Sequence, residues 1–155
     1  MTSTDNRIAR LSIRSLWKVF GPRGKSLLEE EWIYSASRAE VQEKTGHIIA
    51  VRNVNLDIHD GEVFVVMGLS GSGKSTLVRC LIRLIEPSDG AILIDGENIV
   101  DLDRRGLTEL RRHKTGMVFQ HYGLMPHRSV IDNVSYGLEV QGIDEDSRYM
   151  KAMEV

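Results

Sequence analysis

The chain has 155 residues, of which 41% are apolar and 27% charged, values typical of one ordinary globular domain. A formal net charge of −2 gives no support to a nucleic-acid partner, which usually requires a basic surface. No apolar run approaches the roughly 18 residues needed to cross a bilayer, and the N-terminus lacks a signal-peptide core, so we expect membrane contact only through partner proteins. Cys80 cannot form an internal disulfide, and its apolar neighbours predict a buried, reduced packing residue.

Two strands separated by a helical segment are predicted at the start of the chain. Residues 1–10 are expected to be a tail, and alternating apolar side chains predict a strand over 11–17. Residues 22–47 favour one or two short surface helices inserted between strands, with Gly46 as the final C-cap. Residues 48–58 alternate again, which predicts a second strand with one wet face. We expect an antiparallel opening that leads into a parallel arrangement.

The stretch Gly-Leu-Ser-Gly-Ser-Gly-Lys-Ser-Thr fits the pattern G-x-x-x-x-G-K-[ST] of nucleotide phosphate sites. Glycines let backbone N–H groups approach phosphate oxygens closely, because no Cβ stands in the way. Lys74 would supply a positive charge, and Ser75 would offer its hydroxyl to magnesium at the positive end of the helix that follows. The predicted nucleotide-binding residues of this stretch are Gly68, Leu69, Ser70, Gly71, Ser72, Gly73, Lys74, Ser75 and Thr76.

The flanking sequence favours a phosphate site over a Gly/Ser-rich turn with an incidental lysine. The apolar run 62–67 predicts a parallel strand buried on both faces. Between Leu77 and Ile85 only Arg79 and Arg83 are charged, which predicts a helix buried nearly all round. Strand, loop and helix therefore follow in the order that a phosphate loop requires.

Alternating and helical patterns continue through the rest of the chain. Residues 91–96 predict a short strand, 102–113 a helix, and 117–120 a strand that ends on a polar amide, where open α/β sheets place ligand groups. Ser129 and Asp144 are predicted N-caps of two further helices, separated by a glycine. The five histidines are scattered, and the sequence contains no metal-ligand cluster.

Taken in order and spacing, these motifs resemble the ATP-binding subunits of ATP-binding cassette (ABC) transporters from about Leu11 to the end. The resemblance is strongest to the subclass that energises uptake of glycine betaine, proline betaine, choline and related quaternary amines. It is carried by Glu-Lys-Thr-Gly at 43–46, Met-Gly-Leu-Ser-Gly-Ser-Gly at 67–73, Arg-Leu-Ile-Glu-Pro at 83–87, and Leu-Met-Pro-His at 124–127 with Asp132-Asn133. It implies an α/β P-loop NTPase fold of ABC type, with an N-terminal antiparallel β subdomain, a parallel-sheet core, and the start of a helical subdomain in 121–155.

The resemblance also implies roles for individual residues and for partners. Phe20 would stack on adenine, residues 68–76 would hold the phosphates of ATP, and Ser75 and Gln120 would contact Mg²⁺. Gln120 would also contact the attacking water and report the nucleotide state to the membrane subunits. The implied partners are transmembrane permease subunits, a second ATP-binding subunit and, indirectly, a substrate-binding protein, with the chain peripheral at the cytoplasmic face of the plasma membrane.

This sequence departs from the family pattern after Gln120. Residues 121–155 contain no Leu-Ser-Gly-Gly-Gln signature, no Walker B strand ending in Asp-Glu and no switch histidine. We therefore expect an N-terminal portion of the subunit, whose parallel core is incomplete and which contains no catalytic residue of its own. It is expected to bind nucleotide weakly, if at all, and not to hydrolyse ATP alone.

Two other functions stay open at the level of sequence. A different P-loop enzyme, such as a kinase or GTPase, would need its own recognition motif, and no Asn-Lys-x-Asp is present. A non-hydrolytic module that docks on transporter membrane subunits would instead be recognised by co-purification with them.

Overall fold

The computed structural model describes residues 9–120 and 123–155, which divide into one compact unit ending at Leu102 and another from Asp103 to Val155. Most of the predicted N-terminal tail lies outside the described residues, and its last two positions already belong to the first strand. Within the described ranges, no helix is long and apolar enough to cross a membrane.

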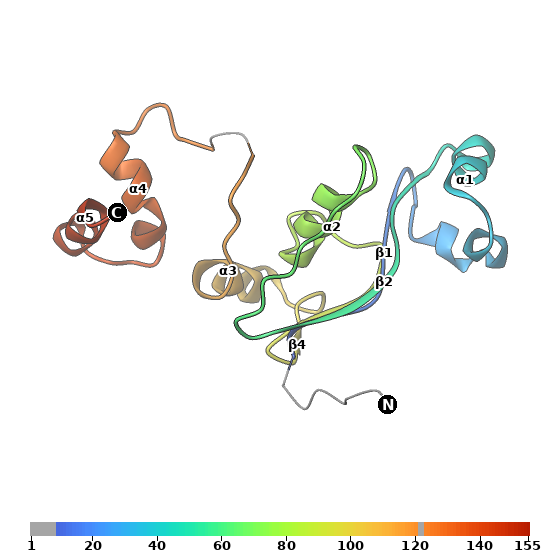
Figure 1. Ribbon diagram of the computed structural model, residues 1–155, viewed down its shortest axis with the longest axis horizontal. Coiled ribbons are helices and arrows are strands. Elements are labelled where there is room, and N and C mark those ends of the chain that lie inside the picture. The colour runs from blue at the N-terminus through green and yellow to red at the C-terminus, as the bar shows by residue number, and fades with distance from the viewer. Residues whose placement is uncertain (1–8, 121–122) are drawn as a thin grey trace. The chain divides into compact units, whose positions relative to one another are not determined.

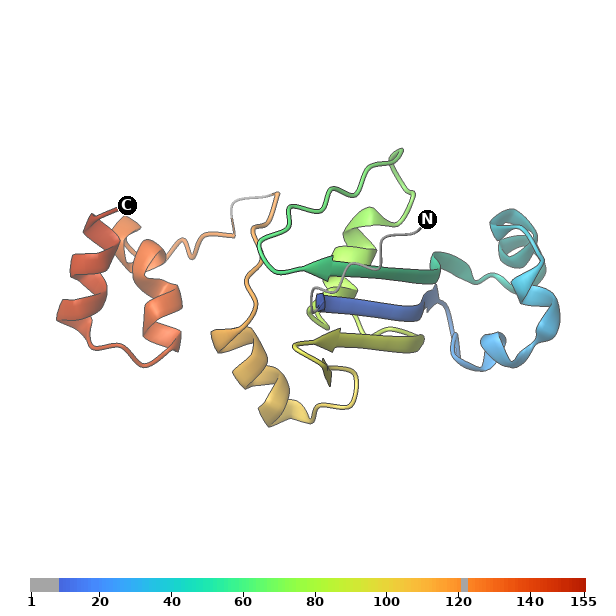
Figure 2. The same ribbon diagram turned by 60° about the horizontal axis from the view of Figure 1, so that its bottom comes forward.

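The N-terminal unit is built on a four-stranded sheet with the order β2-β1-β3-β4 (Figures 1 and 2). Its strands are β1 (Ala9–Phe20), β2 (Ile48–His59), β3 (Asp89–Ile94) and β4 (Glu97–Asn98), and every neighbouring pair is antiparallel. β1 lies between β2 and β3, and its residue Ile13 is fully buried. The predicted antiparallel opening is confirmed, and so are the three longer strands.

Short helices fill the segment between β1 and β2, as predicted. They are the 3₁₀ turns η1 (Ser26–Glu29) and η2 (Glu31–Tyr34) and the helix α1 (Arg38–Thr45). A capping box formed by Ser37 and Glu40 begins α1, and Gly46 ends it in the left-handed conformation at φ 71°. The segment shares a hydrophobic core with the paired strands β1 and β2, the β1–β2 ladder. This core consists of Trp17, Val19, Leu28, Ile33, Val41 and Ile49.

Helix α2 (Lys74–Leu81) begins at the predicted phosphate loop and packs against β2. It buries Leu77 and Cys80 but leaves Val78 39% exposed, and it ends four residues before Ile85. The prediction of a helix buried nearly all round is therefore wrong. The reason is that α2 is covered by the sheet on one side only, so one apolar stripe is buried while the rest faces outward.

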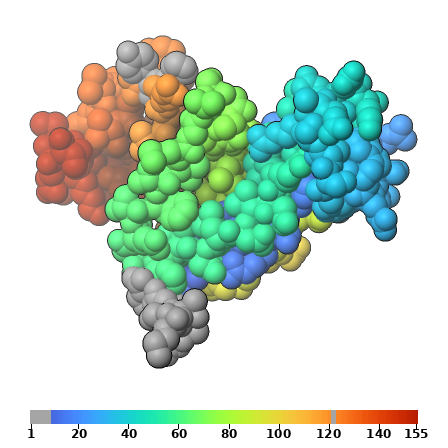
Figure 3. All heavy atoms as spheres, turned by 45° about the vertical axis from the view of Figure 1, so that its right-hand side comes forward, coloured from blue at the N-terminus to red at the C-terminus, as the bar shows by residue number. Residues whose placement is uncertain are grey.

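The predicted parallel strands are not formed. Residues 62–67 and 117–120 belong to no ladder in the described structure, and Met67 and Val118 are 86% and 98% exposed. A parallel strand that is buried on both faces needs hydrogen-bonded neighbouring strands, and the described residues provide none for 62–67. Figure 3 shows the segment that follows β2 lying on the surface of the N-terminal unit.

The described residues of the C-terminal unit form three helices: α3 (Arg104–His113), α4 (Val130–Val140) and α5 (Glu145–Met153). The side chains of Ser129 and Asp144 accept hydrogen bonds from the backbone at the starts of α4 and α5, which confirms both predicted N-caps. The hydroxyl of Tyr149 on α5 donates to Asp132 on α4 and holds the two helices together.

Candidate nucleotide-binding site

The predicted phosphate loop is seated directly on β2. Gly73 is the N-cap of α2 at φ 100°, and a Cβ added there would lie 2.1 Å from the carbonyl oxygen of Ala50 on β2. Any side chain would therefore have to push the loop away from the strand. Gly71 has φ 77° and no atom within 4 Å of such a Cβ, so its requirement for glycine is conformational alone. The loop thus combines a close backbone approach with left-handed turns.

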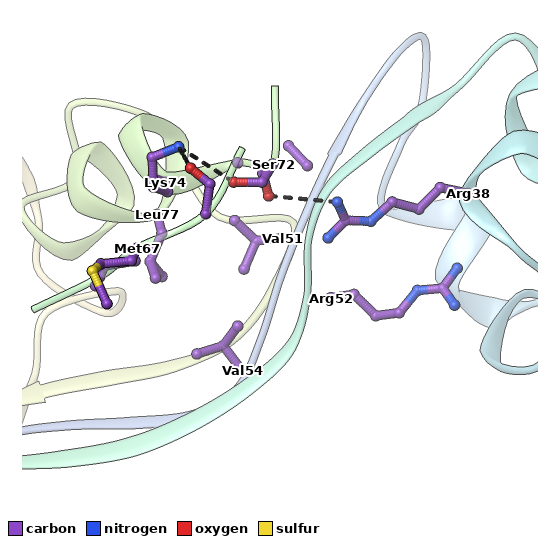
Figure 4. A pocket seen from close by; sticks show the side chains of 12 residues that line it. Arg38, Val51, Arg52, Val54, Met67, Ser72, Lys74 and Leu77 are labelled. Carbon is purple, nitrogen blue, oxygen red and sulfur yellow. Dashed lines mark hydrogen bonds between the residues drawn. The ribbon is translucent and has the colours of Figure 1, made fainter. Parts of the chain in front are cut away.

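Lys74 closes the loop on itself. Its Nζ donates to the carbonyl oxygens of Gly68 and Leu69, at 2.7 Å and 2.8 Å, and lies 3.5 Å from the hydroxyl of Ser72 (Figure 4). These are neutral acceptors that hold a full positive charge at the mouth of the loop. A phosphate oxygen would be a stronger acceptor for the same ammonium group, because both partners would then be charged.

Backbone donors at the start of α2 add to this charge. The first helical hydrogen bond runs from the Leu77 N–H to the Gly73 carbonyl at 2.8 Å, so the N–H groups of Lys74, Ser75 and Thr76 have no acceptor within the helix. They lie at the positive end of the helix dipole, where anions are stabilised. The Ser75 side chain is exposed, and its hydroxyl is a suitable oxygen ligand for magnesium.

A cavity of about 230 Å³ lies between the loop and β2. Its walls include three cationic residues and no acidic one: the cations are Arg38, Arg52 and Lys74. Pockets that enclose a drug-sized ligand usually measure about 300–1,000 Å³, so this one is the right size for part of a nucleotide. A positive lining without an acidic residue favours the phosphate chain as that part.

Phe20 lies at the end of the β1–β2 ladder nearest the loop. It pairs with Ile48, two residues along β2 from the Ala50 carbonyl against which Gly73 packs. Two strand residues span roughly 7 Å, so Phe20 and the phosphate loop lie at the same end of β2. The Phe20 side chain is 39% exposed, and the Nζ of Lys18 lies 4.9 Å from its ring centroid. Stacking of this ring on adenine stays a prediction.

Gln120 belongs to the C-terminal unit, where it is exposed and precedes two residues outside the described structure. Its contact with Mg²⁺ stays a prediction. Within the described residues, no group of three histidine, cysteine, aspartate or glutamate side chains could hold a metal ion.

Two cationic residues of the cavity were missed by sequence reasoning. Arg38 comes from α1, and its Nη1 lies 3.4 Å from the Ser72 carbonyl oxygen, to which it donates a hydrogen bond. Arg52 comes from β2, and its Nη1 donates to the Ala36 carbonyl at 2.8 Å. Neither residue belongs to a recognisable motif, and only the folded position of the segment between β1 and β2 brings Arg38 to the loop.

Comparison with known proteins places this chain in a family. The model of the family described as "ABC transporter" matches residues 51–155. A glycine betaine transport ATP-binding protein, OpuAA of Bacillus subtilis, is 43% identical over 98% of this chain and 36% of its own length. ProV of Escherichia coli, a glycine betaine/proline betaine transport system ATP-binding protein, is 45% identical over 94% of this chain and 36% of its own. The resemblance inferred from the motifs is thus confirmed.

Two further similarities agree with this one. TmoW of Ruegeria pomeroyi, a trimethylamine N-oxide transport system ATP-binding protein, is 49% identical over 94% of this chain and 42% of its own length. The fold matches the ATP-binding cassette MJ0796, solved as a dimer bound to ADP and Pi, with a TM-score of 0.72 and 31% identity over 93% of this chain and 54% of that one. The chain spans about two fifths of the curated relatives that it matches. From sequence, fold and loop geometry together, this chain belongs to the ABC transporter family.

Proposed function

We propose that this chain forms the nucleotide-binding part of an ATP-binding subunit that energises import of glycine betaine, proline betaine or a related quaternary amine. One observation carries the nucleotide assignment: Lys74 and the start of α2 face an acid-free cavity at a loop built on glycine conformations. The transport assignment is supported by the names of relatives that are similar over nearly the whole chain.

The proposed binding mode follows from the positions of the loop residues. The phosphate chain of ATP takes the place of the Gly68 and Leu69 carbonyls at the Lys74 ammonium group, while the free N–H groups of α2 donate to the same oxygens. Ser75 would hold Mg²⁺ through its hydroxyl, and Phe20 would stack on the base. Bound ATP supplies the phosphoryl group whose transfer to water releases energy for transport.

The proposed partners follow from the family. The chain would work with transmembrane permease subunits and a second ATP-binding subunit at the cytoplasmic face of the membrane, and indirectly with a substrate-binding protein. A phosphoryl-transfer site also needs a group that orients the attacking water. The printed sequence has no Asp-Glu strand end to provide one, so we propose that these 155 residues alone do not hydrolyse ATP.

Equilibrium binding of ATP with Mg²⁺ tests the nucleotide assignment. Lys74→Ala should weaken ATP binding at least tenfold, because a charge-assisted contact contributes roughly 1.5–3 kcal/mol. Lys25→Ala is the matched control, since Lys25 is an exposed lysine outside the cavity. Equal affinity of the wild type and Lys74→Ala would refute the assignment. Steady hydrolysis by the 155 residues, abolished by Lys74→Ala, would refute the proposal of inactivity.

Uptake measurements test the cargo. Disruption of the gene should abolish uptake of radiolabelled glycine betaine or proline betaine by the source cells, and leave uptake of an unrelated neutral amino acid unchanged. Normal uptake of both betaines, with loss of a different solute, would retain the ATP-binding assignment and overturn the amine assignment.

A further inference from the structure

The helical segment between β1 and β2 reaches the phosphate loop through one side chain. Arg38, the first residue of α1, donates to the Ser72 carbonyl oxygen and lines the same cavity as Lys74. In Figure 4 this side chain extends from the helical segment toward the loop. Ser72 therefore has a cation at each of two polar groups, with Arg38 at its carbonyl and Lys74 at its hydroxyl.

A well-anchored element presents Arg38. The capping box places Glu40 and Ser37 in reciprocal hydrogen bonds of 2.7 Å and 3.2 Å at the start of α1, immediately beside Arg38. Val41, one turn further on, is fully buried in the core shared with Trp17 of β1. The base of the Arg38 side chain is consequently fixed relative to the sheet on which the loop sits.

Arg38 is the more accessible of the two arginines that line the cavity, since its side chain is exposed and that of Arg52 is half-buried. Arg52 donates from Nη1 to the Ala36 carbonyl and lies 5.8 Å from the Trp17 ring centroid, while its buried Nε and Nη2 have no hydrogen-bond partner within the described residues. Arg38 has one long hydrogen bond of 3.4 Å, and no carboxylate pairs with it within residues 9–120 and 123–155. A guanidinium group has five N–H donors and is well matched to two phosphate oxygens at once.

We propose that Arg38 contacts the phosphate chain of the bound nucleotide, so that α1 contributes a second cation to the site beside Lys74. The ligand class is a nucleoside di- or triphosphate. This inference rests on the proposed function, since it uses the same cavity. It assigns a role in ligand binding to a segment whose sequence indicates only a surface elaboration.

Two substitutions test whether the charge of Arg38 contributes to phosphate binding. Arg38→Ala removes both the charge and the hydrogen bond to Ser72, whereas Arg38→Gln removes the charge and keeps a polar side chain that is two atoms shorter. The protein is expressed from its own reading frame, and its affinities for Mg·ATP and for inorganic tripolyphosphate are measured by calorimetry. Both variants should bind both ligands about tenfold more weakly than the wild type.

Lys25→Ala removes the same charge from an exposed site on the same segment and should bind like the wild type. Wild-type affinity in Arg38→Gln would overturn the inference, because the charge of Arg38 would then not contribute to binding. An equal loss in Lys25→Ala would also overturn it, since the net charge of the protein would then explain the effect.

If Lys74→Ala weakens binding and Arg38→Ala does not, the inference fails and the proposed function stands. If the wild type binds neither ligand, both fail. Thermal midpoints within a few degrees of the wild type show that the variants are folded.

Discussion

Replacing Gly73 by alanine tests how the phosphate loop is seated on the sheet. The new Cβ would lie 2.1 Å from the Ala50 carbonyl oxygen and 3.1 Å from its carbonyl carbon. Both atoms belong to the backbone of β2, so neither can turn aside as a side-chain end could. Relief requires the loop or the strand to move by about 1 Å, and such overpacking costs about 1–3 kcal/mol. Alanine at the positive φ of Gly73 adds about 1–2 kcal/mol.

The expected loss of unfolding free energy for Gly73→Ala is therefore about 2–5 kcal/mol. Gly71→Ala is the matched control, because Gly71 also has a positive φ, 77°, but no atom lies within 4 Å of its added Cβ. It should lose only the conformational part, about 1–2 kcal/mol. Urea unfolding of both variants measures the two losses, and unchanged m-values would show that the unfolded states are comparable.

The difference between the two glycine variants isolates the contact with Ala50. We expect Gly73→Ala to be less stable than Gly71→Ala by about 1–3 kcal/mol. Nucleotide affinity should also fall more in Gly73→Ala than in Gly71→Ala, because the N–H groups at the start of α2 move with the loop. Equal stability of the two variants would refute the reasoning, since the loop would then not be seated on β2 in solution.

Three further predictions concern other parts of the chain. Phe20→Ala should weaken ATP binding roughly tenfold while leaving tripolyphosphate binding nearly intact, and unchanged ATP affinity would make Phe20 a packing residue. Ser129→Ala removes the capping box of α4 and should lower the unfolding free energy by about 1 kcal/mol in urea titrations. Burial raises the pKa of the Cys80 thiol to about 11, so the unfolded chain loses this proton first as the pH rises. Stability should therefore be nearly unaffected by Cys80 below about pH 9 and fall by about 2 kcal/mol by pH 11, a fall that Cys80→Ala should remove.

Local patterns predicted the elements whose stability is largely local or tied to one neighbour. The caps at Gly46, Ser129 and Asp144 depend on side chains or φ angles within three residues of a helix end, which a sequence displays directly. The strands 11–17 and 48–58 alternate because each has one buried face, and this alternation is a local signal as well.

Features that depend on distant partners were not predictable in the same way. The apolar run 62–67 has the composition of a buried strand, but composition says nothing about whether a hydrogen-bonded neighbour is present. The same limit applies to α2, whose apolar residues fit a helix enclosed on all sides, although only Leu77 and Cys80 are buried. The position of Arg38 depends on how a segment 34 residues upstream of Ser72 folds back onto the sheet, which no periodicity encodes.

The core shared by the helical segment and the β1–β2 ladder also determines which parts of the N-terminal unit unfold together. Trp17 and Ile49 contribute to the ladder and to the packing around Val41 at the same time, so neither part can separate without exposing the other. Residues 22–47 and the β1–β2 ladder should then exchange their amide hydrogens as one cooperative unit. Because the phosphate loop rests on β2 through Gly73, a ligand that holds the loop closed would slow exchange in α1 as well.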